Sequence, residues 1–231
     1  MRPRLLDLFC GAGGAGMGYH RAGFDVVGVD IVPQPHYPFE FIQDDALECI
    51  EDADLEYQAI HASPPCQFFS LMSNRARGRG GLADERVDLL TPTLALIRSL
   101  PIPYVVENVV GSAPPLKPTI SLHGGMFGLG VVRTRLFESN VVLMSAAFPI
   151  PVKRIGVYGR APDGRRLWGI HPNSEFRAAA SLKEAQDAMG MDWGDWHGVK
   201  EAIPPAYTEW IGAQLLAALA AHDAARTGEG L

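Results

Sequence analysis

Short apolar runs recur along residues 1–110, and glycine turns or segments with helical spacing separate them. Their length and their content of Val, Ile, Phe and Tyr are typical of buried β-strands. We expect a first helix from the glycine turn to Arg21, a short second helix that starts at Asp44 and Asp45, and a third over residues 87–100. The expected strands are RLLDLF, FDVVGVD, FEFIQ, YQAIHA and PYVVENV, at residues 4–9, 24–30, 39–43, 57–62 and 103–109. Strands that alternate with helices predict an α/β fold with a doubly wound parallel sheet.

The second half of the chain has a different pattern. Residues 124–144 alternate in a way that predicts antiparallel strands, whereas residues 145–180 are rich in Pro, Gly and Arg and have weak periodicity. Helices are expected over residues 181–193, with Ser181 as cap, and over residues 209–222. We therefore predict a main α/β domain and a small irregular lobe. The domain covers residues 1–144 and is completed by the C-terminal helix 201–225, and the lobe covers residues 145–200.

Composition limits the classes of protein that need to be considered. The 231 residues can bury one substantial core, and 47% of them are hydrophobic. No apolar run approaches the roughly 20 residues of a membrane-spanning helix. The three cysteines, Cys10, Cys49 and Cys66, lack the paired spacing of a zinc site. We expect a cytoplasmic monomer without metal or membrane attachment.

The formal net charge of −6 conceals an uneven distribution of acids and bases. Residues 40–56 hold eight acids and no Lys or Arg, whereas residues 151–180 hold six bases and two acids. Three more arginines, Arg75, Arg77 and Arg79, lie in a glycine-rich segment after Cys66. A run of charge is usually only a solvated face, but bases clustered in this way also suit a polyanionic partner.

Cys66 lies in the segment ASPPCQFFS, residues 62–70, directly after a predicted strand and two prolines. The prolines fix the backbone of the turn, so the side chain after them is rigidly held. A lone cysteine is more often a buried packing residue. The Pro-Pro turn and the basic segment beyond it favour a nucleophile instead.

The segment GAGGAG, residues 11–16, satisfies the glycine pattern of a dinucleotide site, and Asp30 ends the next strand. A pyrophosphate at the helix N-terminus would meet the acids Asp7, Asp44 and Asp45 nearby. S-adenosylmethionine carries no phosphate and bears two positive groups, so the acids favour this methyl donor. Asp30 is expected to bind the ribose hydroxyls, Asp45 the adenine amino group, and Phe9 the adenine face. The full set of expected donor contacts is Phe9, Gly11, Gly13, Asp30, Ile31, Asp45 and Pro65.

Together these segments resemble the motifs of DNA cytosine-5 methyltransferases, in the order of that family. The matching segments are DLFCGAGG (7–14), SPPCQFFS (63–70), ENV (107–109), RTR (133–135) and AIPPAYTEWIG (202–212), the last similar to compact, phage-like members. The resemblance implies a Rossmann-like, S-adenosylmethionine-dependent methyltransferase fold, in which the main domain is catalytic and residues 145–200 form the target-recognition lobe. It also implies transfer of a methyl group to carbon 5 of a flipped-out cytosine in double-stranded DNA, with S-adenosylhomocysteine as product.

By the same resemblance, Cys66 adds to carbon 6 of the base and Glu107 contacts ring nitrogen 3 and the exocyclic amine. Arg135 would hold the carbonyl oxygen of the base, and Arg133 would order the site around it. The base-reading lobe is small, which implies a short target site in the DNA. The expected DNA contacts are Gln67, Ser70, Arg75, Arg77, Arg79, Lys153, Arg160, Arg165 and Arg166. A restriction-modification role and a phage source in a bacterial host are the expected context.

Two positions depart from the family pattern. Val131 stands where the family has glutamine before the two arginines, and Pro204-Pro205-Ala206 replaces Gly-Asn-Ser. The second change leaves open an altered methyl donor. Three further alternatives are a tRNA cytosine-5 methyltransferase, a hydride-transfer enzyme and a DNA-binding protein without activity. The hydride-transfer alternative leaves Cys66, Glu107 and Arg135 unexplained.

Overall fold

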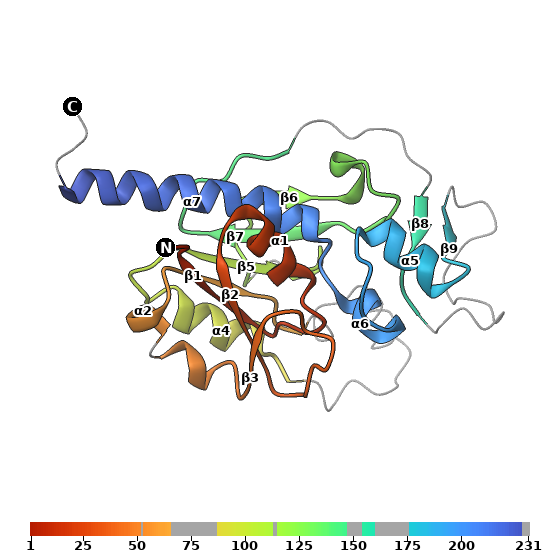
Figure 1. Ribbon diagram of the computed structural model, residues 1–231, viewed down its shortest axis with the longest axis horizontal. Helices are drawn as coiled ribbons and strands as arrows, with labels where there is room; N and C mark the ends of the chain where they lie inside the picture. The colour runs from red at the N-terminus through yellow and green to blue at the C-terminus, as the bar shows by residue number, and fades with distance from the viewer. Residues whose placement is uncertain (52, 66–86, 113–114, 147–153, 160–175, 228–231) are drawn as a thin grey trace.

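A computed structural model describes residues 1–51, 53–65, 87–112, 115–146, 154–159 and 176–227 (Figure 1). Its centre is a seven-stranded sheet in the order β3-β2-β1-β4-β5-β7-β6. The strands are β1 (Arg4–Leu8), β2 (Asp25–Asp30), β3 (Glu40–Gln43), β4 (Ala59–Ala62), β5 (Tyr104–Asn108), β6 (Ile120–Leu122) and β7 (Arg135–Ser139). All five strands expected within residues 1–110 are present, each within one or two residues of the predicted bounds.

The first five strands run parallel, and β7 enters antiparallel between β5 and β6. The chain order reverses between β1 and β4, because β2 and β3 lie on one side of β1 and the later strands lie on the other. Ligands of open α/β sheets bind outside the carboxyl ends of the strands at such a reversal. The predicted doubly wound α/β fold is confirmed.

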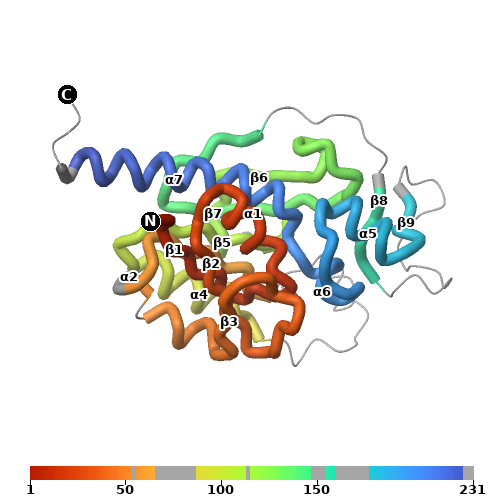
Figure 2. Tube along the Cα trace, viewed as in Figure 1, coloured from red at the N-terminus to blue at the C-terminus, as the bar shows by residue number. Residues whose placement is uncertain are grey.

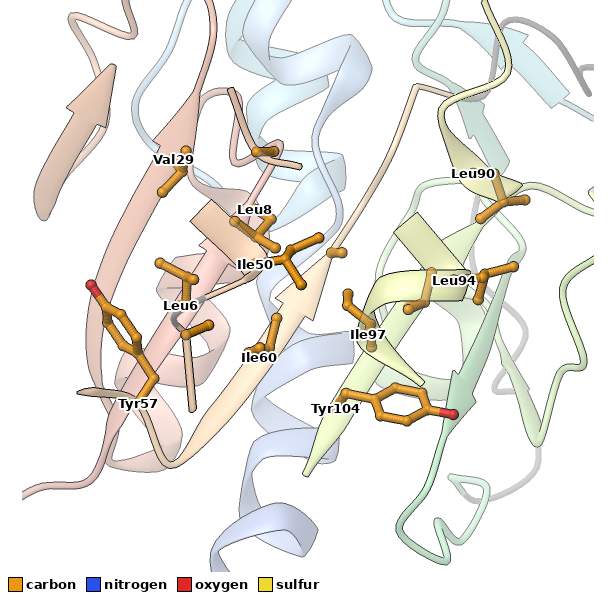
Figure 3. Packing of buried hydrophobic residues seen from close by; sticks show 14 of the residues in the cluster. Leu6, Leu8, Val29, Ile50, Tyr57, Ile60, Leu90, Leu94, Ile97 and Tyr104 are labelled. Carbon is orange, nitrogen blue, oxygen red and sulfur yellow. The ribbon is translucent and has the colours of Figure 1, made fainter. Parts of the chain in front are cut away.

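Helices cover both faces of the sheet. The first face carries α1 (Gly14–Ala22) and α7 (Pro205–Thr227), and the second carries the 3-10 turn η1 (Glu48–Ile50), α2 (Ala53–Glu56) and α4 (Leu90–Ile97). Side chains alternate along β1, so Leu5 packs on the first face while Leu6 and Leu8 pack on the second. Figure 3 shows this second core, where Leu6 and Ile60 face Ile97 of α4.

Helix α7 packs along α1 and ties the end of the chain to its beginning. A Cβ atom on Gly18 would come within 2.2 Å of the carbonyl oxygen of Pro205, so only glycine allows this approach. The Thr208 hydroxyl donates a hydrogen bond to the Ala15 carbonyl across the same contact. The last turns of α7 extend beyond the sheet (Figure 2). The helix begins at Pro205, four residues before the predicted start, because proline is well tolerated in the first turn of a helix.

The later elements form a small core of their own. They are strands β8 (Arg154–Gly156) and β9 (Phe176–Ala178), and helices α5 (Leu182–Met189) and α6 (Trp196–Glu201), whereas the 3-10 turn η3 (Gly124–Phe127) packs on the first face of the sheet. Their buried side chains include Val157, Met189 and Val199. Figure 1 shows these elements beside the carboxyl end of the parallel strands. The division into two domains stays a prediction.

Two predictions for this region were wrong in part. Residues 124–144 contain one strand, β7, because residues 124–127 close into a 3-10 turn that ends at Gly128 with φ 69°. The helix predicted over residues 181–193 ends at Met189, where Gly190 takes φ 71°. Ser181 caps it as expected, accepting a hydrogen bond from the Glu184 amide. The sequence pattern did not predict α6.

Candidate active site

A cavity of about 650 Å³ lies at the carboxyl ends of β1, β2, β4 and β5. It is the place where a doubly wound sheet is expected to bind its ligand, and its volume suits a nucleotide-sized molecule. Residues from each of the predicted motifs described by the structure reach it. Among the predicted site residues, those lining the cavity are Phe9, Gly11, Asp30, Ile31, Asp45, Pro65, Glu107 and Arg135.

The turn after β1 brings a ring and a carboxylate to the same wall. Phe9 has φ 55°, which is rare for a residue with a side chain and costs about 1–3 kcal/mol. This strained backbone lies where the Phe9 side chain lines the cavity. Asp30 is held at both oxygens, because it accepts hydrogen bonds from the Gly11 and Val32 amides, each 3.0 Å long. Each oxygen keeps a free lone pair for a ligand hydroxyl.

Gly13 is required for packing, and it does not itself line the cavity. Its φ is 81°, and an added Cβ atom would come within 2.7 Å of Pro38 and 2.9 Å of the Tyr37 ring. The Tyr37 hydroxyl donates a 3.1 Å hydrogen bond to Asp7, which is fully buried behind the turn. Burial raises the pKa of Asp7 to about 8, although the bonds from Tyr37 and from the Gly16 amide oppose the rise. Sequence reasoning did not identify Tyr37, which lies 30 residues from its partner.

A second acid and an exposed apolar side chain also line the cavity. Asp45 lines the cavity, and its Oδ1 accepts a 2.8 Å hydrogen bond from the Leu47 amide. Ile31 is 66% exposed and lines the cavity, so its side chain is available for apolar contact with a ligand. The two residues therefore offer one polar and one apolar contact to a flat ring.

The Pro-Pro turn reaches the cavity from β4. Both Pro64 and Pro65 line it, and the Asn108 side-chain amide donates a 3.0 Å hydrogen bond to the Pro64 carbonyl. Asn108 is buried and thereby fixes the turn against the end of β5. Cys66 follows Pro65 in the sequence and lies outside the described residues.

Glu107 and Arg135 form an ion pair inside the cavity. Arg135 Nε lies 2.8 Å from Glu107 Oε1. Among the described residues, however, no donor makes a hydrogen bond to that oxygen, so the contact is an ion pair without a hydrogen bond. Burial raises the pKa of Glu107, while the positive charge of Arg135 and a hydrogen bond from Ser63 oppose the rise. The pair thus combines a buried carboxyl that has spare hydrogen-bonding capacity with a cation beside it.

Arg133 has a different environment from Arg135. Its buried guanidinium donates to the carbonyl oxygens of Ala202, Val157 and Lys200, at 2.5, 2.6 and 2.7 Å. It does not line the cavity. Two of these carbonyls lie at the C-terminal end of α6, which leaves backbone acceptors without partners in the helix. Arg133 therefore fixes α6 in place, and the Tyr207 hydroxyl in turn donates to the Arg133 carbonyl at 2.5 Å.

Helix α6 forms a wall of the cavity that sequence reasoning missed. Its side chains His197 and Glu201 line the cavity, together with Asp195 at its N-terminus. The Asp195 side chain accepts from the Gly198 amide, and the Trp193 indole donates a 2.7 Å bond to the Ala12 carbonyl in the glycine turn. An aspartate directly before the first helical residue is a capping signal, but a helix of six residues has too little periodicity to be recognised.

The two departures from the motif pattern also have local explanations. Val131 is buried and bridges to Ile155 of β8, so an apolar side chain suits the small core there. Pro204 lies directly before α7, and Pro205 is its first residue. The cavity wall at this point is made by Ala202 and Ile203.

The charge in the cavity is mainly acidic. Among the described lining residues, Arg135 is the one arginine or lysine. The acids are Asp7, Asp30, Asp45, Glu107, Asp195 and Glu201. Such a site disfavours a pyrophosphate and suits a ligand that carries positive charge.

The predicted DNA contacts cannot be placed on this site. All nine lie outside the described residues: Gln67, Ser70, Arg75, Arg77, Arg79, Lys153, Arg160, Arg165 and Arg166. In the part of the chain that the structure describes, His, Cys, Asp and Glu residues form no group that could hold a metal ion. Within the same residues, no helix is both long enough and apolar enough to cross a bilayer.

Sequence comparison connects this site with known proteins. Residues 3–113 match the model of the family described as C-5 cytosine-specific DNA methylase. The chain is 26% identical over 187 residues to Type II methyltransferase M.AgeI of Thalassovita gelatinovora, covering 71% of this chain and 41% of that protein. It is 35% identical over 130 residues to Type II methyltransferase M.AquIA of Picosynechococcus sp., covering 48% and 50%. The chain thus spans half or less of the length of these two relatives.

Solved structures share the fold over nearly the whole chain. One is a prophage-encoded protein from E. coli described as a DNA modification methyltransferase, with a TM-score of 0.60 and 17% identity, covering 95% of this chain and 99% of that one. Another is the Dnmt2 methyltransferase of S. pombe, with a TM-score of 0.59, 14% identity and the same coverage of both chains. At these identities the likeness shows the fold alone.

Proposed function

We propose, from the match of residues 3–113 to the C-5 cytosine-specific DNA methylase family, that the chain belongs to this family and methylates carbon 5 of cytosine in double-stranded DNA. One observation carries the proposal. The Glu107–Arg135 ion pair opens into the same cavity as Phe9 and Asp30, so a base and a methyl donor would meet there. The Type II methyltransferase relatives suggest a restriction-modification context.

The described residues fit S-adenosylmethionine as the donor. Asp30 offers both oxygens to the ribose hydroxyls, and Phe9 offers a ring face to the adenine. Asp45 and Ile31 provide an acceptor and an apolar cover for the same ring. When bound, the donor supplies an electrophilic methyl group on a sulfonium. The acids of the cavity complement its positive groups.

The base requires activation, because carbon 5 of cytosine is a poor nucleophile. In our proposal the Cys66 thiolate adds to carbon 6, which moves electron density onto carbon 5 and ring nitrogen 3. Glu107 donates a proton or hydrogen bond at nitrogen 3 and accepts from the exocyclic amine. Arg135 binds the carbonyl oxygen of the base and keeps Glu107 in place. After methyl transfer, loss of the proton from carbon 5 expels the thiolate.

The cytosine has to leave the duplex for this chemistry. A stacked base cannot present one face to a thiol and its carbon 5 to a methyl donor in a closed cavity. The arginines after Cys66 and within residues 151–180 would bind phosphates around the flipped base. A short target site remains our expectation, because few base-reading side chains are available in that segment.

Tritium transfer from labelled S-adenosylmethionine to duplex DNA tests the activity, with nucleoside mass spectrometry to identify the product. The proposal requires 5-methylcytosine with the wild type and none with Glu107→Gln. Arg98→Met is a suitable control, because Arg98 pairs with Glu138 outside the cavity. Methyl transfer to tRNA but not to DNA, or to adenine, would refute the proposal.

A further inference from the structure

A chain of polar side chains, buried at Tyr19 and His61 and partly buried at Ser63 where it reaches the cavity, leads from α1 through β4 to Glu107 of β5. The Tyr19 hydroxyl lies 3.0 Å from His61 Nδ1, and His61 Nε2 lies 2.7 Å from the Ser63 hydroxyl oxygen. Ser63 in turn hydrogen-bonds to the Glu107 carboxyl. Tyr19 and His61 have no exposed surface and do not line the cavity. The resemblance to known motifs gives them no role.

The sheet brings these residues together by register. His61 of β4 is paired with Val105 of β5, so Ser63 and Glu107, each two residues further on, lie side by side at the carboxyl ends. His61 and Ser63 are two residues apart and share one face of the sheet. Tyr19 of α1 covers that face and packs its ring on the His61 ring at 5.2 Å.

When Glu107 is ionised, the donors and acceptors of these side chains fix the position of each proton between Tyr19 and Glu107. An ionised Glu107 can only accept, so the Ser63 hydroxyl has to donate to it. The Ser63 oxygen then accepts from His61, which places the imidazole proton on Nε2. Nδ1 is left as an acceptor for the Tyr19 hydroxyl proton. Burial lowers the pKa of His61 to about 3, so the ring stays neutral in this arrangement.

We propose that Tyr19, His61 and Ser63 are positioning residues for Glu107. They hold one oxygen of its carboxylate as an acceptor, so that a proton taken up by Glu107 goes to the other oxygen. They also lower the affinity of the Glu107 carboxylate for that proton. The inference rests on the proposed function, in which Glu107 meets the base. It adds that the orientation of this carboxyl is set from α1.

Other groups that act on Glu107 change little near neutral pH. Arg135 and Arg133 face it from β7 and the segment before it, and both stay charged. Tyr207 faces it from α7, and burial raises the pKa of that phenol, so it stays neutral. Burial likewise raises the pKa of Tyr19 on α1. Asp7 of β1 is paired with His61 in the sheet, and burial raises its pKa to about 8, so it titrates as well and the Glu107 signal has to be followed individually.

Ser63→Ala tests the last link of the chain. Loss of a hydrogen bond to a charged group should raise the midpoint of the Glu107 titration by about one pH unit. The midpoint is measured by carboxyl ¹³C NMR, with the Glu107 signal assigned by its loss in Glu107→Gln. Ser139→Ala is the matched control, because it removes a buried serine hydroxyl that bonds to the Tyr104 carbonyl on the far part of β5. Ser63→Thr should restore the wild-type midpoint.

Tyr19→Phe tests the first link, with Tyr104→Phe as the control for loss of a buried phenol hydroxyl. Imidazole ¹⁵N NMR should show that wild-type His61 is protonated on Nε2 and bare on Nδ1. Tyr19→Phe should move the His61 signals toward a mixture of tautomers, and Tyr104→Phe should leave them unchanged. An Nδ1 proton in the wild type would overturn the inference, as would equal Glu107 midpoints in Ser63→Ala and Ser139→Ala.

These NMR measurements need no DNA, so they separate this inference from the proposed function. If wild type lacks methyl transfer but the midpoint moves as expected, the proposed function fails and the link from Ser63 to Glu107 stands. If transfer occurs and its pH profile is the same in wild type and Ser63→Ala, the positioning role is overturned. The proposed function would then stand without it.

Discussion

Asp7 and Glu107 are buried carboxyl groups, and both line the same cavity. Both have a raised pKa because burial penalises the charged form more than their partners favour it. In each group one oxygen also lacks a hydrogen-bond donor among the described residues. At the residue scale, therefore, each of these two carboxyl groups has an oxygen that could still accept a hydrogen bond. Buried ionisable groups with a shifted pKa are common where a ligand binds.

The Asp7 carboxyl gives a pH-dependent prediction about stability. Its pKa is about 8 in the folded protein and near 3.8 in the unfolded chain, so over that interval the folded state binds more protons. Stability should consequently fall as the pH rises from about 4 to about 8. Asp7→Asn, which resembles the protonated form, should flatten this decline in melting temperature measured by circular dichroism. A decline as steep as that of the wild type would show that Asp7 is not its source.

Local motifs in the sequence identified residues that line the cavity, but they did not identify residues whose position depends on distant partners. The motifs gave Phe9, Asp30 and Glu107 directly, since each follows a strand that ends at the cavity. Tyr37 was not identifiable, because its role depends on contact with Asp7 across β2. The two arginines of one motif could not be told apart, because only the fold shows that Arg133 faces backbone carbonyls.

At the scale of elements, the glycine turn at residues 11–16 packs closely against Tyr37. Gly13→Ala should destabilise the protein in two ways, through the left-handed φ and through contact with Tyr37 and Pro38. Gly128→Ala is a matched control, because φ is 69° there and no atom lies within 4 Å of the added Cβ. The control should cost about 1–2 kcal/mol and Gly13→Ala about 1–3 kcal/mol more, measured by urea unfolding. Equal costs would mean that Tyr37 moves aside freely.

Helix α6 forms a wall of the cavity, and Arg133 anchors it. Arg133→Met should release the C-terminal carbonyls of α6 and lower the affinity for S-adenosylmethionine by about tenfold, or 1.4 kcal/mol, in calorimetry. Arg98→Met removes a comparable set of bonds to Glu138 and Pro115, away from the cavity. It should lower stability without changing donor affinity. A similar loss of affinity in both variants would indicate a general effect of destabilisation.

At the scale of the whole molecule, the sequence predicted the sheet better than the elements packed at its carboxyl end. Parallel strands are buried on both faces, so their apolar runs are conspicuous in the sequence. Helix α6 and strands β8 and β9 are short, and they are stabilised by contacts among residues 131–202. Their placement depends on distant contacts such as Trp193 with Ala12.

The acidic cavity predicts which cofactor class the whole protein accepts. S-adenosylmethionine should bind measurably in calorimetry and NAD should not, because Arg135 is the one described lining arginine or lysine and it is paired with Glu107. Asp30→Ala should weaken the binding of the methyl donor, since it removes the ribose acceptor. Tighter binding of NAD than of S-adenosylmethionine would instead favour the hydride-transfer alternative.

The central claim is that the protein transfers a methyl group to cytosine while Cys66 is bonded covalently to the base. Duplex DNA containing 5-fluorocytosine at the target site tests it directly, because fluorine blocks the final elimination and traps the base on the enzyme. With S-adenosylmethionine present, intact mass spectrometry should show a covalent complex of wild type with methylated DNA, linked through Cys66, and none with Cys66→Ser. Trapping that persists in Cys66→Ser, or target cytosines methylated by the wild type without any trapped complex on the fluorinated duplex, would contradict the account.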